Sequence, residues 1–170
     1  MTGPAADGGQ VAGDGLVLRQ WHETDLDVMV ELFDAPDIGA RTPLPSPFTP
    51  AEARARLARA QSGEPLMLAV TTDGVEPLGE VLLMADGTIG YVLGTRHRGQ
   101  GLAARALRLL RDHAHAVLGV ELLRLEIEPD NTPSARVAER GGFRLAQAGA
   151  KTGELKSRRY VLDVWEHRAT

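Results

Sequence analysis

A segment near the middle of the chain combines three consecutive basic residues with two glycines. It reads Thr-Arg-His-Arg-Gly-Gln-Gly-Leu-Ala-Ala over residues 95–104, and a predicted helix begins at about Gly101. Glycines let the backbone turn tightly and let its N–H groups approach an anion, while a helix N-terminus adds about half a positive charge. These properties predict a pyrophosphate-binding loop, formed by Arg98, Gly99, Gln100, Gly101, Leu102, Ala103 and Ala104.

Other interpretations of this loop compete with a pyrophosphate site. Gly99-x-Gly101-x-x-Ala104 formally matches the GxGxxG/A fingerprint of dinucleotide-binding proteins. Glu121 and Glu126 fall near the spacing of the ribose-binding acid. However, the fingerprint turn directly follows its strand, and here four residues intervene. The absence of Gly-Lys-Ser/Thr excludes a P-loop. A turn that only connects a strand to a helix would not need the basic residues.

The elements that must position this loop alternate in an irregular order. A strand at 88–93 precedes the loop, and a helix at about 101–118, a strand at 121–127 and a helix at 132–140 follow it. Upstream, the patterns predict a strand at 16–19, helices after 24 and over about 50–61, and strands at 65–71 and 78–84. Two more strands are expected near 143–147 and 157–164. This order predicts a single α+β domain with a mixed sheet.

Two segments are predicted to lack regular structure. Residues 1–15 contain five glycines and little apolar surface, so we expect a flexible leader followed by one domain over residues 16–170. Residues 36–50 carry five of the ten prolines, which remove backbone donors and fix φ. At the end of this segment, Thr49-Pro50-Ala51-Glu52 predicts a capped helix start.

The composition excludes several classes of protein. The formal net charge of −4 argues against general nucleic-acid binding, which needs a basic surface. With no cysteine, the chain has neither disulfides nor a cysteine nucleophile. No apolar run is long enough to cross a membrane, and no signal peptide is recognisable, so a cytoplasmic location is expected. No histidine motif or carboxylate cluster indicates a metal.

With these motifs in place, the chain resembles the GNAT superfamily of acyl-CoA-dependent N-acyltransferases. Residues 98–103 match the Gln/Arg-x-x-Gly-x-Gly/Ala motif of the family. Residues 125–134, Leu-Glu-Ile-Glu-Pro-Asp-Asn-Thr-Pro-Ser, and 137–143, Val-Ala-Glu-Arg-Gly-Gly-Phe, resemble its next strand and helix. The patterns at 16–26 and 90–93 are most similar to the ribosomal-protein alanine acetyltransferases, the RimJ/RimL-like subgroup. The similarity spans about residues 16 to 165.

The resemblance implies a specific architecture and a coenzyme site. It implies a twisted, mostly antiparallel sheet of about seven strands with about four helices, splayed between strands 88–93 and 121–127. Acetyl-CoA would enter the gap as a co-substrate. Its pantetheine arm would pair with the backbone of Val92 and Leu93, as an added strand would, and Asn131 would hold the same arm.

The resemblance defines the catalytic residues less completely. Many relatives carry a tyrosine acid where this chain has Ala138, and a glutamate where it has Thr88. The subgroup offers Ser134 as the group that protonates the coenzyme thiolate, although Ser134 could simply support the helix N-terminus. Glu126 is the preferred general base because it matches a glutamate typical of the family. Glu80, Glu128 and an ordered water are the alternatives.

The expected function is therefore acetyl transfer from acetyl-CoA directly to a primary amine, on a protein N-terminus or a small molecule. The proline-rich segment would line the acceptor pocket, with Asp34 and Asp37 attracting an ammonium group beside Arg41. A catalytically weak acyl-CoA sensor or partner module is the alternative, since Ala138 and Thr88 replace catalytic groups. Homodimers are common in the family, but no pattern in this chain decides its oligomeric state.

Overall fold

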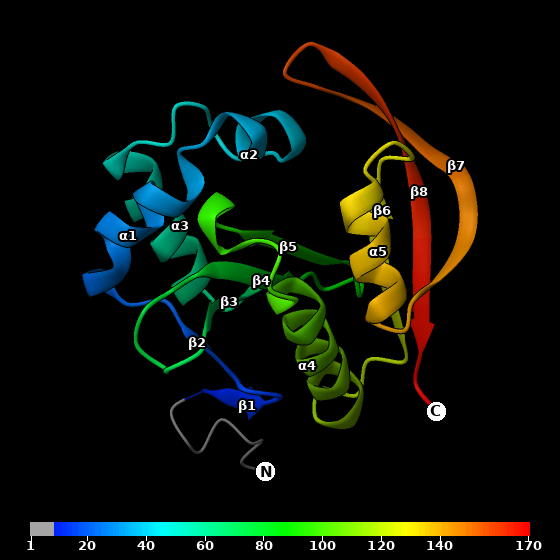
Figure 1. The fold of residues 1–170 in the computed structure, drawn as a ribbon, viewed down its shortest axis with the longest axis horizontal. Coiled ribbons are helices and arrows are strands. Elements are labelled where there is room, and N and C mark those ends of the chain that lie inside the picture. The colour runs from blue at the N-terminus through cyan, green and yellow to red at the C-terminus, as the bar shows by residue number, and fades with distance from the viewer. Residues whose placement is uncertain (1–8) are drawn as a thin grey trace.

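The computed structural model describes residues 9–170 and contains two antiparallel sheets. The larger sheet has five strands in sequential order, so each strand pairs with the next one along the chain. Figure 1 shows this sheet at the centre of the molecule. Its strands are β1 (Val11–Gly13), β2 (Leu16–Gln20), β3 (Leu66–Thr71), β4 (Gly79–Leu83) and β5 (Ile89–Leu93).

The smaller sheet has the order β6-β8-β7 and comprises β6 (Leu122–Ile127), β7 (Arg144–Leu155) and β8 (Arg158–Arg168). Thr88 and Arg124 form an isolated parallel bridge between the two sheets, and the Arg124 N–H donates to the Gly87 carbonyl at 3.0 Å. Beyond this point β5 and β6 are not paired. The predicted splay between these two strands is therefore confirmed.

The helices cover opposite faces of the larger sheet. Helices α1 (Leu26–Phe33), α2 (Pro36–Arg41) and α3 (Pro50–Gln61) enclose one hydrophobic cluster with Trp21, Phe33 and Phe48. On the other face, α4 (Leu102–Ala116) and α5 (Thr132–Arg140) pack on a second cluster that includes Leu68, Val81 and Leu107. Short 3-10 turns span Glu23–Asp25 and Thr95–His97. No helix in the described part of the chain has the length and apolarity needed to cross a membrane.

Residue patterns explain why these elements form where they do. In β6, Leu123, Leu125 and Ile127 are buried and the residues between them are partly exposed, as a period of two requires. Helix α3 begins as predicted, because the Thr49 hydroxyl accepts from the Glu52 N–H at 3.3 Å and Pro50 occupies the first turn.

A buried ion pair fixes the chain between β2 and α1. The Arg19 guanidinium donates to both carboxylate oxygens of Asp25, at 2.8 and 2.9 Å, and both side chains are less than a tenth exposed. The His22 N–H donates to the same carboxylate at 2.8 Å. Burial alone would raise the pKa of Asp25, but these donors outweigh it and the pKa lies below its ordinary value.

Two predictions of irregular structure were wrong where the structure describes the chain. The proline-rich segment contains α2, because Pro36 occupies its first turn, where proline suits a helix. The expected leader contains β1, which pairs with β2 through Val11–Leu18 and Gly13–Leu16. Residues 1–8 lie outside the described residues, and the boundary at residue 15 stays a prediction. With β1 and α2, residues 9–170 contain eight strands and five α-helices, against about seven strands and about four helices expected.

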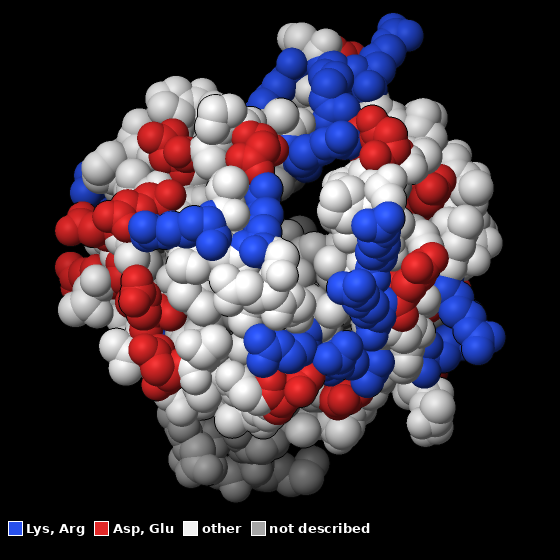
Figure 2. Space-filling model, in the orientation of Figure 1, with Lys and Arg blue, Asp and Glu red and all other residues white. Residues whose placement is uncertain are grey.

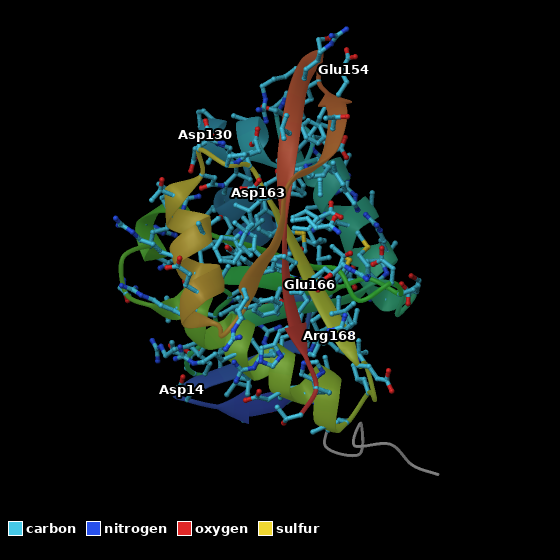
Figure 3. All side chains as sticks on the ribbon, turned by 90° about the vertical axis from the view of Figure 1, so that its right-hand side faces the viewer. Asp14, Asp130, Glu154, Asp163, Glu166 and Arg168 are labelled. Atoms are coloured by element: carbon cyan, nitrogen blue, oxygen red, sulfur yellow. The ribbon has the colours of Figure 1, made fainter. Side chains whose placement is uncertain are left out.

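The last two strands form a hairpin much longer than predicted. Figure 3 shows this hairpin toward the viewer, with Glu154 near its tip and Arg168 near its other end. Lys156 and Ser157 make the turn, and both have positive φ, at 51° and 63°. The hairpin tip reaches α2 (Figure 1), where the Lys156 ammonium donates to the carbonyls of Gly39 and Leu44 at 2.6 and 2.5 Å.

Candidate functional site

A cleft of about 1010 Å³ opens where the two sheets separate. Residues of α2, α3, β5, β6, α5 and the β7–β8 hairpin line it, together with the loop before α4. Figure 2 shows it as a hollow near the centre of this face of the molecule. The cleft therefore connects the face covered by α4 and α5 with the face covered by α1–α3.

The glycine loop brings a free helix N-terminus to this cleft. Gly101 precedes α4 with a left-handed φ of 72°, and no side chain of the described residues caps the helix there. The first N–H groups of a helix have no partner within it. Those of Leu102, Ala103 and Ala104 are therefore available where these residues line the cleft. A Cβ added at Gly99 or Gly101 would meet no atom within 4 Å, so the space beside both glycines is open.

Other loop residues have defined positions. Arg98 lines the cleft, forms an ion pair with Asp37 of α2, and also donates to the Leu93 carbonyl at 3.4 Å. Burial is the largest single influence on Asp37 and acts to raise its pKa, but the hydrogen bond and charge of Arg98, together with backbone N–H donors, outweigh it, so the pKa of that carboxyl lies below its ordinary value. The Gln100 side chain is exposed, and Gln100 is absent from the cleft lining.

Val92 and Leu93 line the cleft along the edge of β5 that faces β6. Glu80 of β4 is the partner of Val92, and the bonds that Thr88 and Gly94 make to β4 place the backbone groups of Val92 on the β4 side as well. The pairing expected at Val92 is therefore wrong, and the backbone groups of Leu93 face the free edge. Beyond the bridge at Thr88, no described strand pairs with the free edge of β5. Backbone donors and acceptors on this edge are therefore available to an extended ligand.

Asn131 and Ser134 meet the cleft at the start of α5. The Asn131 side chain accepts from the Ser134 N–H at 3.4 Å and caps the helix. The cap is thus Asn131, so the Ser134 hydroxyl is not needed for that purpose. Tyr91 of β5 donates through its hydroxyl to the Ser134 carbonyl at 3.2 Å. Burial raises the pKa of Tyr91.

Glu126 of β6 and Glu128, which directly follows this strand, both line the cleft. Glu126 forms an ion pair with Lys151 of β7. Glu128 accepts from Arg158 of β8 and from Arg41 of α2, the latter at 3.0 Å. The hydrogen bond from Arg158 is the largest influence on Glu128 and lowers its pKa. Burial is the next largest and acts in the opposite direction, and Arg41 lowers the pKa further. Glu128 therefore joins three elements, while Glu126 has one partner.

Glu80 is separated from the cleft. It is 1% exposed, accepts from Trp21 at 2.9 Å and from Arg56, and does not line the cleft. Burial raises its pKa although Arg56 and Trp21 act in the opposite direction. Ala138 is fully buried, and Thr88 lies at the bridge that closes the splay.

The charged residues expected around the acceptor have other roles. Asp34 accepts from the Phe48 N–H at 3.1 Å and does not line the cleft, which argues against its expected contact with an ammonium group. Asp37 pairs with Arg98, and Arg41 pairs with Glu128 and Asp130. No sequence pattern predicts that Arg158 reaches the cleft or that Lys156 contacts α2, because both placements depend on the length of the hairpin.

Among residues 9–170, no group of three or more histidine, aspartate or glutamate side chains is placed to bind a metal ion. Basic side chains do gather beside the hollow, over α4 and α5 (Figure 2). Arg105, Arg108 and Arg111 belong to α4, and Arg136 and Arg140 to α5. An anionic ligand approaching this face would meet positive charge although the whole chain is acidic.

Comparison with known proteins agrees with this geometry. The model of the acetyltransferase (GNAT) domain matches residues 15–144. The uncharacterized N-acetyltransferase p20 of Bacillus licheniformis is 31% identical over 77 residues, which are 45% of this chain and 42% of that protein. The chain thus matches less than half the length of this curated relative.

Solved structures share the fold. An acetyltransferase (GNAT family) from Bacillus anthracis has a TM-score of 0.84 at 18% identity, covering 94% of this chain and 98% of that one. The RimL ribosomal L7/L12 alpha-N-protein acetyltransferase in complex with coenzyme A has a TM-score of 0.74 at 18% identity, covering 94% and 97% of the two chains. At these identities the likeness concerns the fold.

Proposed function

The chain belongs to the acetyltransferase (GNAT) family, and on this basis we propose that it transfers an acetyl group from acetyl-CoA directly to a primary amine. One observation carries the proposal. The uncapped N-terminus of α4, at the left-handed Gly101, opens into a cleft between two separated strands. A pyrophosphate suits the free N–H groups of the helix N-terminus, and an extended arm with amide groups suits the unpaired strand edge in the cleft.

In this proposal each part of the coenzyme has its own group of residues. The N–H groups at the start of α4 and the Arg98 guanidinium bind the pyrophosphate. Gln100 does not line the cleft, so we assign it no direct contact with the coenzyme, although the sequence predicted one. The pantetheine amides pair with the free edge of β5 at Leu93, because the backbone groups of Val92 point to β4, and Asn131 binds the same arm from α5.

The chemistry requires a neutral amine, a polarised thioester and a proton for the leaving thiolate. The amine nitrogen attacks the thioester carbon, the new C–N bond forms, and the C–S bond breaks. No acetyl-enzyme on cysteine is available, since the chain has none. Ser134 gives a proton to the thiolate, because its hydroxyl is released from capping and its residue lines the cleft.

The proton of the attacking amine goes to Glu126, directly or through a water molecule. Of the three carboxylates considered, Glu80 is buried away from the cleft. Glu128 is held by two arginines that lower its pKa and make it a weaker base. Glu126 lines the cleft with a single lysine partner.

We place the acceptor on the side of the cleft bordered by α2, α3 and the β7–β8 hairpin, opposite α4 and α5. Its class is a primary amine, on a protein N-terminus as for the RimJ/RimL-like subgroup, or on a small molecule. Acetyl-CoA and such acceptors are available in the cytoplasm, the compartment expected from the sequence.

Thiol release from acetyl-CoA, measured with peptides bearing free N-termini, polyamines and aminoglycosides, tests this function. We expect turnover with at least one acceptor and binding of coenzyme A by calorimetry. Tight coenzyme A binding without turnover on any acceptor would favour the sensor instead. Binding of a nicotinamide dinucleotide in place of coenzyme A would favour the dinucleotide interpretation.

Replacing Ser134 with alanine should lower kcat about 100-fold, the usual contribution of a positioned acid, with KM for acetyl-CoA nearly unchanged. Asn131 still caps α5 in this variant, so the helix stays in place. Thr132→Val in the same helix turn is the control, because Thr132 does not line the cleft. Equal rates for the serine and alanine enzymes would remove Ser134 from the mechanism.

Replacing Glu126 with glutamine should lower kcat by about 10- to 100-fold at neutral pH, because no carboxylate then accepts the proton of the attacking amine. Glu166→Gln is matched to it, since Glu166 is also an ion-paired glutamate of the smaller sheet but does not line the cleft. This control should keep full activity. If both variants retain wild-type kcat, Glu126 is not the base.

A further inference from the structure

Tyr91 makes a side-chain hydrogen bond across the opening between the two sheets. Its residue belongs to β5 of the larger sheet, and its ring packs against the hydrophobic cluster under α4. Its hydroxyl donates to the Ser134 carbonyl of α5, a helix that follows β6 of the smaller sheet. The bond therefore joins two segments 43 residues apart in sequence.

The position of this bond along the cleft is informative. The two sheets meet at Thr88 and Arg124, at the closed end of the splay. Tyr91 lies three residues farther along β5, about 10 Å toward the open part at the usual strand rise. Both Tyr91 and Ser134 line the cleft there. The bond thus lies within the proposed coenzyme site and not at the Thr88–Arg124 bridge, where the two sheets meet.

Side chains form hydrogen bonds with both backbone groups of Ser134, the N–H and the carbonyl. Asn131 accepts from its N–H, and Tyr91 donates to its carbonyl. The hydroxyl of Tyr91 carries a single proton, which this bond uses. Burial raises the pKa of Tyr91, so the phenol stays protonated and remains a donor. Its geometry suits a role in fixing Ser134 more than a role in giving up a proton.

We propose that Tyr91 is a positioning residue that fixes the start of α5 across the cleft and so sets the place of the Ser134 hydroxyl relative to the coenzyme sulfur. This inference rests on the role of Ser134 in the proposed function.

Tyr91→Phe keeps the ring and removes only the hydroxyl. The chain has two tyrosines, and the other, Tyr160 of β8, lines the same cleft but makes no hydrogen bond through its hydroxyl in the described residues. Tyr160→Phe is therefore the matched control for the hydrogen-exchange measurement below. Because Tyr160 lines the acceptor side of the cleft, the control for kcat is Thr132→Val, which removes a hydroxyl from the same turn of α5 outside the cleft. We expect Tyr91→Phe to lower kcat about tenfold with little change in KM for acetyl-CoA, as for a misplaced catalytic group, and Thr132→Val to retain kcat.

A double-mutant cycle separates positioning from direct catalysis. In the Ser134→Ala background, Tyr91→Phe should cause no further loss of kcat, because the group that it positions is gone. A second tenfold loss in that background would overturn the proposal and make Tyr91 a catalytic group in its own right. Unchanged kcat in the single variant would overturn it as well.

Amide hydrogen exchange over residues 132–138 provides a readout that needs no turnover. Tyr91→Phe should accelerate exchange there, and Tyr160→Phe should not. Equal protection in Tyr91→Phe and the wild type would overturn the proposal. A wild-type chain that binds coenzyme A but acetylates no amine would instead contradict the proposed function, and the exchange measurement would still decide whether Tyr91 holds α5.

Discussion

Replacing Gly101 with glutamate is expected to abolish coenzyme A binding at concentrations that saturate the wild type. Gly101 precedes α4, and the space beside it is open, so the new carboxylate would stand where we propose that the pyrophosphate binds. Placing like charges together in a binding site costs several kcal/mol, and about 3 kcal/mol corresponds to a Kd increase of about 100-fold. Isothermal titration calorimetry measures this loss.

The same helix supplies a matched control at its other end. Gly119 follows α4 with a φ of 71°, and a Cβ there would also meet no atom within 4 Å. Glutamate at either position therefore costs a similar backbone strain of about 1–2 kcal/mol. Gly119→Glu should bind coenzyme A normally. If Gly101→Glu does so too, the start of α4 is not the pyrophosphate site.

Replacing Asp25 with asparagine should lower the free energy of unfolding by about 3 kcal/mol or more at neutral pH. The change leaves the Arg19 charge buried without its carboxylate, and breaking a buried ion pair in this way costs about 3–5 kcal/mol. Urea denaturation followed by fluorescence measures the loss. Asp27→Asn is the control, because Asp27 is exposed on α1, and its change should cost less than about 1 kcal/mol.

The advantage of the wild type over Asp25→Asn should also depend on pH. The folded protein holds the pKa of Asp25 below its ordinary value, so the unfolded chain binds the proton more readily. The stabilisation is complete above the unfolded pKa of about 3.9 and is lost as the pH falls through the folded pKa. A difference between the two proteins that stays constant from neutral pH down to strongly acidic pH would contradict this assignment.

The parts of the fold that depend on local signals could be predicted from the sequence. The Thr49 cap and Pro50 define the start of α3, and the alternation in β6 identifies its buried face. The glycines before α4 locate the cleft because a left-handed residue and a free helix end are properties of a few adjacent residues.

The missed elements lacked such signals or carried misleading ones. Prolines indicated irregular structure in residues 36–50, yet Pro36 at the first helical turn favours α2. The β7–β8 turn uses Lys156 and Ser157 at positive φ, where asparagine and glycine are the usual residues. Because this turn signal is absent, the residue patterns predicted only two short strands, near 143–147 and 157–164, where the structure has one long hairpin.

In the site, the sequence predicted which residues line the cleft better than it predicted their partners. Most loop residues reach the cleft, but the Tyr91–Ser134 bond joins segments that only the folded chain brings together. The same is true of Glu128, whose arginine partners are 87 and 30 residues away. Spacing along the chain carries no information about such contacts.

Helix α2 is bound at one end to the loop before α4 and at the other end to β8 and the residue after β6. Near its N-terminus Asp37 pairs with Arg98, while at its other end Arg41 pairs with Glu128 and the Ala40 carbonyl accepts from Arg158 at 3.1 Å. A pyrophosphate bound by Arg98 would compete with Asp37 for the guanidinium. If that ion pair broke, α2 would keep its contacts with Glu128 and Arg158. Thermodynamic linkage then makes the effect reciprocal: whatever the coenzyme does to the affinity for the acceptor, the acceptor does to the affinity for the coenzyme. We expect the two substrates to bind interdependently, with a six-residue helix as the element that both of them bias.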